Sequence, residues 1–255
     1  MKMRSLLASA ACTLAVAAHA AEIRVQSAVG FKPVMAEAAA AFEKSTGNRV
    51  EVMYGTLGQV QKRMEAGAPA DVVVIPRQGL EALASQGRLD AARIVPIARS
   101  VMGMAVARGR EKPDISTAEG FKRALLESPK VTTVDPATGG ASAVYFHTLF
   151  ERMQIEDQLR PKLDYVAGVG REGVAEAAAQ GRIVLTLNQL HEITGVEGLD
   201  VVGPLPDELQ QVTVFSAAVM PKSNNARVAR EFVDYLASRE TQALVKARGL
   251  QPAAP

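Results

Sequence analysis

Apolar and polar positions along residues 23–236 predict an alternation of short strands and amphipathic helices. Ile23 to Ser27 alternates apolar with polar residues as a half-buried strand does. Lys32 to Glu43 repeats apolar side chains on one helical face, and a capping box of Ser116 and Glu119 predicts the start of a later helix. The same succession continues, with further strands expected at 49–54, 71–75, 131–134, 163–167 and 182–187 and further helices at 59–66, 78–86, 141–153, 172–180 and 226–236.

Strands that alternate with helices of this length are typical of an open α/β fold with mainly parallel sheets flanked by helices. The strand at 71–75 is apolar on both faces, as expected of a strand that helices cover on both sides. Two strand-like stretches, Ile97–Ala107 and Val212–Met220, fall where one α/β block gives way to another. We interpret them as hinge crossings between two lobes, the first formed by residues 22–98 plus 216–255 and the second by residues 99–215.

The start of the chain predicts a cleavable secretory signal peptide over residues 1–20. A basic start precedes a mostly apolar stretch at 6–18, and Ala18-His19-Ala20 has the small residues of a cleavage site. The apolar stretch is shorter than the roughly 20 residues that span a bilayer. We therefore expect a soluble periplasmic protein without cysteine, because Cys12, the single cysteine of the chain, leaves with the signal.

Charge and composition narrow the range of partners. The whole chain has 29 basic and 27 acidic residues, and loss of Lys2 and Arg4 with the signal makes the mature chain formally neutral. Nucleic-acid binding needs concentrated positive charge, so we expect no nucleic-acid partner. A charged fraction of 22% and a hydrophobic fraction of 48% indicate a globular protein rather than a disordered or multispan membrane chain.

Sequence motifs for catalysis or for metal binding are few. The chain has no Gly-x-Ser-x-Gly, His-Glu-x-x-His or phosphate-loop motif, and beyond the signal its histidines are His147 and His191. We expect no metal, no cofactor and a binding protein rather than an enzyme. Two alternatives belong to other classes: a secreted enzyme, such as a hydrolase that uses one of these histidines, and a sensory module on the same scaffold, against which the signal peptide argues.

Loops rich in glycine and hydroxyl residues follow several of the predicted strands. Open α/β sheets bind ligands at the carboxyl ends of their strands, where a following helix offers free N–H groups and the positive end of its dipole. Glycine in such a loop lets the backbone approach a ligand closely. We therefore predict an interlobe cleft that holds a small anionic solute mostly through backbone N–H groups, with contacts from Ser27, Gly30, Thr56, Gly139, Gly140, Ser142 and Gly170.

Three further residues at strand ends are additional candidates for ligand contact. Tyr54 ends the strand at 49–54, and Arg77 follows the strand at 71–75 with a guanidinium that can pair a ligand carboxylate. Gln189 follows the strand at 182–187. If the strand ends of both lobes face one cleft, these side chains reach it from either side.

Several runs of the sequence resemble those of molybdate-type periplasmic substrate-binding proteins of ABC importers. The resemblance covers essentially the whole mature chain and rests on Glu65-Ala66-Gly67-Ala68-Pro69-Ala70-Asp71, on Asp135-Pro136-Ala137-Thr138-Gly139-Gly140 and on Phe232-Val233-Asp234-Tyr235-Leu236-Ala237-Ser238. It implies the two-lobed type II periplasmic binding protein fold. It also implies delivery of the bound solute to an ABC transporter permease in the inner membrane.

The same resemblance implies a ligand site whose side chains differ in this sequence. Molybdate-binding members hold their oxyanion through two serines, a tyrosine and backbone N–H groups, and the three side-chain positions fall here on Gly30, Leu57 and Leu187. Each lost hydroxyl removes about 0.5–1.5 kcal/mol of net hydrogen bonding. We therefore expect a divergent member of the family that binds a small anion, either a molybdate-like oxyanion or a small carboxylate.

Overall fold

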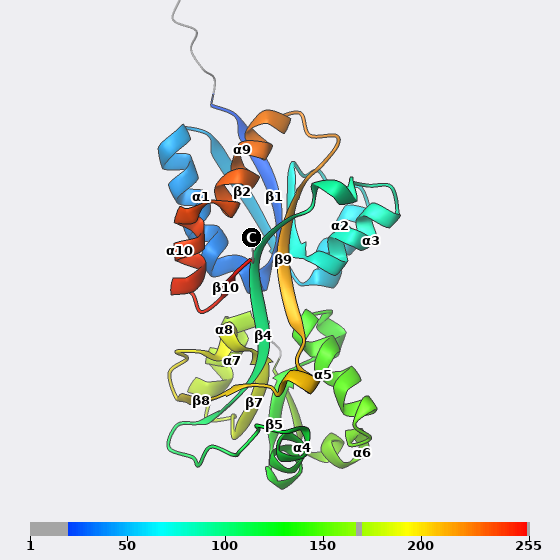
Figure 1. The fold of residues 1–255 in the computed structure, drawn as a ribbon, viewed down its shortest axis with the longest axis vertical. Coiled ribbons are helices and arrows are strands. Elements are labelled where there is room, and N and C mark those ends of the chain that lie inside the picture. The colour runs from blue at the N-terminus through cyan, green and yellow to red at the C-terminus, as the bar shows by residue number, and fades with distance from the viewer. Residues whose placement is uncertain (1–19, 167–169, 254–255) are drawn as a thin grey trace, which may run out of the picture.

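The computed structural model describes residues 20–166 and 170–253, so nearly all of the predicted signal peptide lies outside the described residues. The described chain forms two lobes that are stacked along the long axis of the molecule and joined by two long strands (Figure 1). Both helices and strands occur in each lobe, as the sequence pattern predicts. The site discussed below lies where the two lobes meet.

The upper lobe in Figure 1 is built on three parallel strands in the order β2-β1-β3. Its helices cover both faces of the sheet, with α1, α9 and α10 on one side and α2 and α3 on the other (Figure 1). These elements are β1 (Glu22–Ala28), α1 (Lys32–Thr46), β2 (Arg49–Gly55), α2 (Leu57–Glu65), β3 (Val72–Pro76), α3 (Arg77–Ser85), α9 (Ala226–Ala237) and α10 (Arg239–Ala247).

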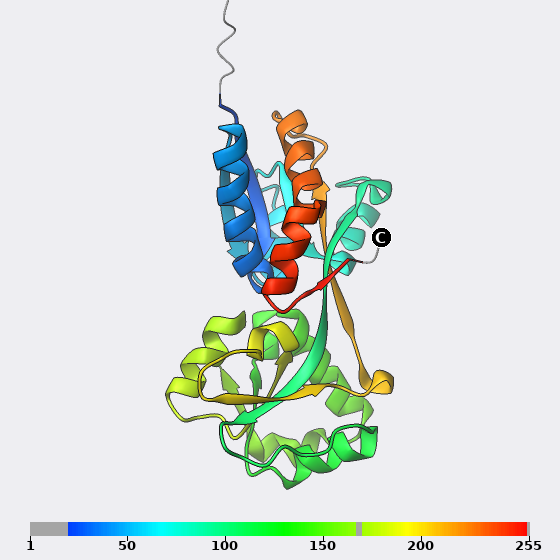
Figure 2. The same ribbon diagram turned by 60° about the vertical axis from the view of Figure 1, so that its left-hand side comes forward.

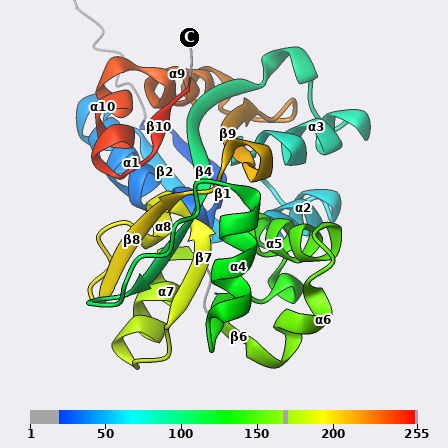
Figure 3. The same cartoon turned by 60° about the horizontal axis from the view of Figure 1, so that its bottom comes forward.

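The lower lobe repeats this arrangement with parallel strands in the order β7-β5-β6. Seen from below, α4, α5 and α6 lie on one side of β7, and α7 lies on the other (Figure 3). The elements are α4 (Ala118–Glu127), β5 (Val131–Val134), α5 (Ala141–Arg152), α6 (Glu156–Leu159), β6 (Leu163–Val166), α7 (Gly170–Ala179), β7 (Leu185–Gln189), α8 (Leu190–Ile193) and β8 (Leu199–Pro204).

Two antiparallel strands, β4 (Val95–Ala107) and β9 (Val212–Val219), run from one lobe to the other (Figure 2). The first half of β4 pairs with β9, and its second half pairs with β7 and β8. A short final strand, β10 (Gln251–Pro252), pairs with β4 at Ala98 and Arg99. The crossing strands add antiparallel pairs to otherwise parallel sheets. The lobe boundaries predicted at 98/99 and 215/216 fall inside β4 and β9, and they stay a prediction.

Each lobe packs around its own hydrophobic core. One core draws its buried residues from 23–98 and 215–250, including Phe42 and Phe232, whose rings meet edge to face at 5.0 Å. The cores of the other lobe draw theirs from 102–209 and lie on the two faces of its sheet. Because burial of apolar surface is the main stabilising term, each lobe is held together within itself. The lobes can therefore change their mutual position without unpacking a core.

Short 3-10 turns connect several of these elements. They are η1 (Val29–Phe31), η2 (Ala91–Arg93), η3 (Pro136–Thr138), η4 (Arg160–Lys162) and η5 (Asp207–Leu209). Two of them, η1 and η3, replace the simple loops predicted after β1 and β5.

The helix caps differ from the sequence prediction in two places. The predicted helix 59–66 begins at Leu57, because Thr56 and Gln59 form a capping box in which each side chain bonds the other residue's backbone N–H. The capping box predicted at Ser116 and Glu119 is wrong. Thr117 is the N-cap of α4, and its hydroxyl accepts a hydrogen bond from Gly120 N–H at 3.1 Å.

Candidate functional site

A small cavity of about 40 Å³ lies between the lobes at the carboxyl ends of β1, β2, β3, β5 and β7. We call it the inner cavity. It brings together most of the residues that the sequence predicted as ligand contacts. Its lining is Ala28, Val29, Gly30, Gly55, Thr56, Leu57, Pro76, Val134, Gly140, Ala141, Ser142, Gly170, Gln189, Glu192 and Phe215.

The starts of helices from both lobes converge on the inner cavity. The upper lobe contributes the η1 turn before α1 and the first turn of α2, and the lower lobe contributes the first residues of α5 and α7. Gly140 is the N-cap of α5 and has no side chain to bond the N–H groups of the first turn. Free N–H groups and the positive ends of helix dipoles favour a negatively charged occupant.

Gln189 adds a polar side chain to the wall of the inner cavity. It is the last residue of β7 and is almost fully buried at the inner cavity. Its Oε1 atom has no hydrogen-bond partner among the described residues. Buried polar atoms without a partner are costly, and this oxygen, which only accepts, can be satisfied by a group that donates a hydrogen bond.

Four of the predicted residues do not line the inner cavity. Ser27 is buried and donates its hydroxyl to Ala28 O at 3.3 Å, and Gly139 O accepts a hydrogen bond from Gly58 N across the cleft at 3.3 Å. Tyr54 is only half-buried. The Arg77 Nε atom donates to Glu81 Oε1 at 2.7 Å on an exposed stretch of α3.

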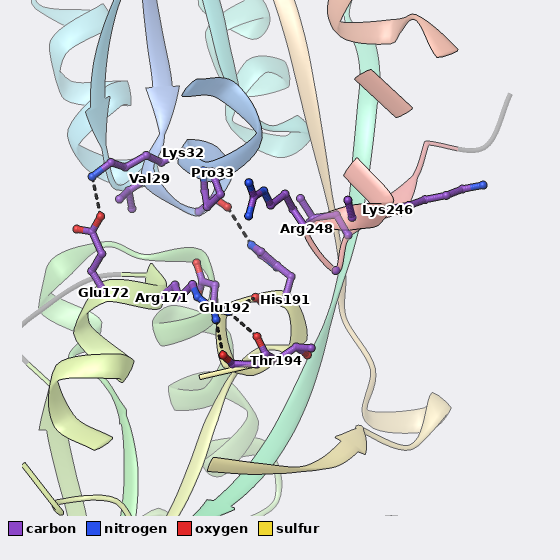
Figure 4. A pocket seen from close by; sticks show the side chains of 15 residues that line it. Val29, Lys32, Pro33, Arg171, Glu172, His191, Glu192, Thr194, Lys246 and Arg248 are labelled. Carbon is purple, nitrogen blue, oxygen red and sulfur yellow. Dashed lines mark hydrogen bonds and ion pairs between the residues drawn. The ribbon is translucent and has the colours of Figure 1, made fainter. Parts of the chain in front are cut away.

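A second cavity of about 530 Å³ opens beside the first (Figure 4). We call it the outer cavity. Its wall is formed by residues 29–33 of the upper lobe, residues 171–195 of the lower lobe, and residues 246–250 at the end of α10 and just after it. It shares Val29, Gly30 and Glu192 with the inner cavity. The sequence analysis did not predict this cavity, because its wall includes a C-terminal segment that is distant in sequence.

His191 on α8 bridges the two lobes and the crossing strand β4. Its Nε2 atom lies 2.9 Å from Gly30 O, and its Nδ1 atom lies 2.7 Å from the Ser100 hydroxyl. A carbonyl can only accept, so Nε2 carries the proton and Nδ1 accepts from Ser100. Burial lowers the pKa of His191 to about 4, and the ring is therefore neutral near pH 7. His147, the other histidine considered above, is exposed on α5 and lies 3.5 Å from Glu151.

Glu192, also on α8, places a carboxyl group at the boundary of the two cavities (Figure 4). It is only 4% exposed. The carboxyl packs against glycine backbone, since a methyl group added at Gly30 or Gly170 would lie 2.9 Å or 3.5 Å from Glu192 Oε1. Burial raises the pKa of Glu192 to about 7, and the Asn188 side chain offsets only part of this rise.

Three of the cations that line the outer cavity have partners in the structure. Lys32 forms an ion pair with Glu172 across the lobes at 2.6 Å, and Arg248 pairs with Glu37 (Figure 4 shows the first pair). Arg171 donates instead to backbone carbonyls near the end of α8, including Gly195 O at 2.7 Å. Backbone carbonyls carry no formal charge, so the positive charge of Arg171, on the wall of the outer cavity, has no carboxylate partner among the described residues.

The described residues were compared with two further kinds of structure, a metal site and a membrane-spanning helix. Among residues 20–166 and 170–253, no group of three or more His, Cys, Asp or Glu side chains is placed to hold a metal ion. Over the same ranges, no helix is both long and apolar enough to cross a membrane. The wall of the inner cavity combines helix starts and apolar side chains with the polar side chains of Gln189 and Glu192.

Comparison with known proteins identifies the family. The sequence model for bacterial extracellular solute-binding proteins matches residues 23–251. The chain belongs to this family. Among curated relatives of this solute-binding protein, an aconitate isomerase from a Pseudomonas species is 33% identical over 90% of this chain and 87% of its own length. The molybdate-binding protein ModA of Azotobacter vinelandii is 26% identical over 96% of both chains.

Solved structures agree with the fold. The periplasmic molybdate-binding protein of Azotobacter vinelandii superimposes with a TM-score of 0.71 at 18% identity, over 91% of this chain and 99% of the other. The sulfate-binding protein SubI of Mycobacterium tuberculosis gives 0.72 at 20% identity, over 92% and 88%. The predicted type II periplasmic binding protein fold is confirmed. The sequence analysis did not foresee the similarity to an isomerase.

Proposed function

We propose that this solute-binding protein captures a small anion in the inner cavity and delivers it to the permease of an ABC importer. The observation that carries the proposal is the convergence of helix starts from both lobes on one small cavity. The start of α5, which has no capping side chain, offers backbone N–H donors that can hold an anion without a formal counter-charge. Curated and structural relatives that bind molybdate or sulfate support the same class of ligand.

The proposed place of action is the periplasm. The predicted signal peptide at residues 1–20 supports export, and the family description as extracellular solute-binding proteins agrees with it. An exported binding protein needs a membrane partner to bring its solute into the cell. We assign that role to an ABC transporter permease in the inner membrane.

The size of the cavities limits the ligand. A cavity needs a volume of about 10–15 Å³, measured in the same way, to hold one water molecule. The inner cavity, at about 40 Å³, therefore suits one tetrahedral oxyanion or one carboxylate group. A larger organic anion reaches into the outer cavity, whose volume of about 530 Å³ is in the usual range for small-molecule sites.

A thermal-shift panel with sulfate, molybdate, citrate and aconitate tests the proposal. We expect at least one of these anions to raise the melting temperature of the protein, because a ligand that binds only the folded state stabilises it. Thr56→Ala and Thr117→Ala form a matched pair of variants. Each removes a helix N-cap and costs about 1 kcal/mol of stability, but of these two threonines only Thr56 lines the inner cavity.

The comparison of the two variants separates binding from stability. We expect Thr56→Ala to weaken the response to the anion and Thr117→Ala to leave it as in the wild type. Equal responses in both variants contradict a role of Thr56 in the site. If no anion of the panel shifts the melting temperature of the wild type, the proposed function is wrong.

A second candidate function is isomerisation of an unsaturated polycarboxylate such as aconitate. Two observations favour it: the 33% identity to an aconitate isomerase and the Glu192 carboxyl at the cavity boundary. Burial raises the pKa of Glu192 to about 7, so the group can take and return a proton near neutral pH. This candidate replaces the hydrolase considered in the sequence analysis.

The chemistry needs one proton-transfer group and no cofactor. Ionised Glu192 removes a proton from the CH₂ carbon beside the double bond, and the electron pair left behind shifts the double bond by one carbon. Glu192 then returns the proton to the far carbon of the three-carbon unit. Atoms and electrons balance, because the product has the composition of the substrate.

Incubation with cis- or trans-aconitate tests this second function, with proton NMR as the readout. We expect interconversion by the wild type, and a loss of at least about 100-fold in the Glu192→Gln variant, since general acid–base groups contribute that much. Glu172→Gln is the control, because Glu172 lines the outer cavity but is exposed and paired with Lys32. No interconversion by the wild type rejects the isomerase.

A further inference from the structure

Glu192 is an unexpected neighbour for a bound anion. The inner cavity gathers donors for negative charge, yet its wall includes a carboxyl that is 4% exposed. Two like charges in a small cavity of low polarity repel each other strongly. An ionised Glu192 therefore opposes the binding for which the helix starts are arranged.

The groups packed around Glu192 do not neutralise it. The upper lobe presents Val29 and the Gly30 backbone, and Lys32 at the start of α1 is paired with Glu172 of α7. On α7, Arg171 donates to backbone carbonyls. Neighbours from the remaining elements are Asn188 and Gln189 at the end of β7 and neutral His191 on α8. The end of α10 contributes Lys246, and Arg248 just after it pairs with Glu37.

No ion pair of Glu192 occurs among the described residues, although ion pairs of several other carboxylates do. A buried carboxyl without a cationic partner is stable mainly in its neutral form. The neutral form carries an O–H group, which is a donor. An O–H hydrogen bond to an anion is charge-assisted and therefore stronger than one between neutral groups.

We propose that Glu192 binds the anion as a protonated acid that donates its O–H group, so that the cleft takes up each anion together with one proton. This inference rests on the proposed function, because it assigns a residue and a proton to the same anion site. The chemistry selects a fully ionised oxyanion or carboxylate, which has lone pairs to accept the O–H. It also makes Glu192 the residue that couples solute capture to pH.

The coupling has a definite direction. In the free protein Glu192 loses its proton around pH 7. Above that pH the anion binds only after the carboxyl regains its proton, so the affinity falls by up to about tenfold per pH unit. Below about pH 6 the carboxyl is already protonated in the free protein, and the affinity becomes independent of pH.

Isothermal titration calorimetry with molybdate, sulfate and aconitate from about pH 6 to pH 9 at constant ionic strength tests the inference. Titrations in HEPES and in Tris, whose ionisation enthalpies differ, count the protons taken up. We expect uptake of close to one proton per anion at about pH 8.5 and much less at about pH 6. Glu192→Gln, whose neutral amide resembles the protonated acid in shape, is expected to bind with no proton uptake and no pH dependence.

Glu172→Gln is the matched control, because it removes one negative charge from the same cleft without removing the proposed proton. We expect it to keep the pH dependence of the wild type. Circular dichroism melts establish that both variants are folded. Binding by the wild type without proton uptake, or an unchanged pH dependence in Glu192→Gln, overturns this inference alone. Absence of binding for all three anions overturns the proposed function and this inference with it.

Discussion

Gly30 occupies a position where the chain has no room for a side chain. A methyl group there would lie 2.9 Å from Glu192 Oε1 and 3.4 Å from Phe215 Cζ. The same residue supplies the carbonyl that accepts the His191 hydrogen bond. One glycine of the upper lobe thus fixes the positions of two polar side chains of the lower lobe.

Gly30→Ala is expected to destabilise the protein by about 1–3 kcal/mol, the usual cost of overpacking a filled space. Urea denaturation measures the change. Gly140→Ala is the control: its nearest neighbour atom would be 3.5 Å away and its φ is −69°, so the added methyl group overpacks nothing and the cost is expected to be smaller than at Gly30.

A double mutant identifies the source of the Gly30 effect. Glu192→Ala removes the atom that the new methyl group would strike. In that background Gly30→Ala should cost less, with a coupling of about 0.5–3 kcal/mol between the two positions. A penalty of the same size in both backgrounds would show that Glu192 is not the obstacle.

The short helix α8 carries two titratable groups whose burial acts in opposite directions. His191 and Glu192 are adjacent in sequence and both are buried. Burial lowers the pKa of His191 from 6.5 to about 4 and raises the pKa of Glu192 from 4.5 to about 7. Burial disfavours the charged form in each case, and a histidine and a glutamate are charged on opposite sides of their pKa.

The effects of the two groups on stability should nearly cancel between about pH 4.5 and 6.5. The contribution of Glu192 is complete below pH 4.5 and is lost as the pH rises to about 7, because the folded state holds the proton more tightly. The contribution of His191 is complete above pH 6.5 and is lost as the pH falls to about 4.

Single substitutions should uncover each contribution in urea unfolding curves at several pH values. Relative to the wild type, the stability of Glu192→Gln should rise with pH across this window by up to about 1.4 kcal/mol per pH unit. The stability of His191→Gln should fall with pH by a similar amount. Variants whose pH slopes match that of the wild type would rule out the opposed shifts.

The order of elements was predictable because periodicity along the chain reports which face of each element is buried. Strand and helix alternation, both crossing strands and the glycine-rich turns at Gly30, Gly140 and Gly170 follow from local pattern. The end of β7 was placed two residues too early, because polar Asn188 and Gln189 continue the strand by pairing with β4. Local polarity does not reveal a partner strand.

Glu192 was not predictable as a site residue for a similar reason. Its carboxyl packs against the backbone of Gly30 in the other lobe, which is far from it in sequence. Its position, three residues beyond Gln189 at a strand end, was the available signal. Glycine and hydroxyl residues at strand ends were the criterion for ligand contacts. Such residues donate hydrogen bonds, so the criterion does not select an acidic residue.

At the scale of the whole molecule, few polar contacts hold the two lobes together. They include the hydrogen bond from His191 to Gly30, the hydrogen bond from Gly58 to Gly139 and the exposed ion pair of Lys32 with Glu172. Exposed ion pairs contribute about 0–1 kcal/mol. With separate cores in each lobe, we expect the mutual position of the lobes to depend on what occupies the cleft.

A cysteine pair at Gly58 and Gly139 should lock the closed arrangement. A methyl group at Gly58 would lie 3.6 Å from Gly139 Cα, close enough for a disulfide after small adjustments. The single native cysteine, Cys12, lies in the predicted signal peptide, so the pair has no competing thiol in the mature chain. The left-handed φ of 68° at Gly139 makes the cysteine there strained by about 1–2 kcal/mol.

Small-angle X-ray scattering measures the result. The oxidised variant should keep one small radius of gyration with or without an anion. The wild type should reach that radius only when an anion is bound. A wild type that has the same radius in both conditions would show that the lobes do not move on binding.

The pairing of β10 with β4 determines where a fusion partner can be attached to this protein. The last strand lies against the crossing strand at Ala98 and Arg99, whereas the chain enters β1 at the far end of the upper lobe (Figure 1). A fluorescent protein fused after Pro252 is therefore attached beside the crossing strands, and its signal is expected to change when these strands bend. A purification handle placed ahead of Glu22 stays clear of the moving parts and leaves the cleft free to open.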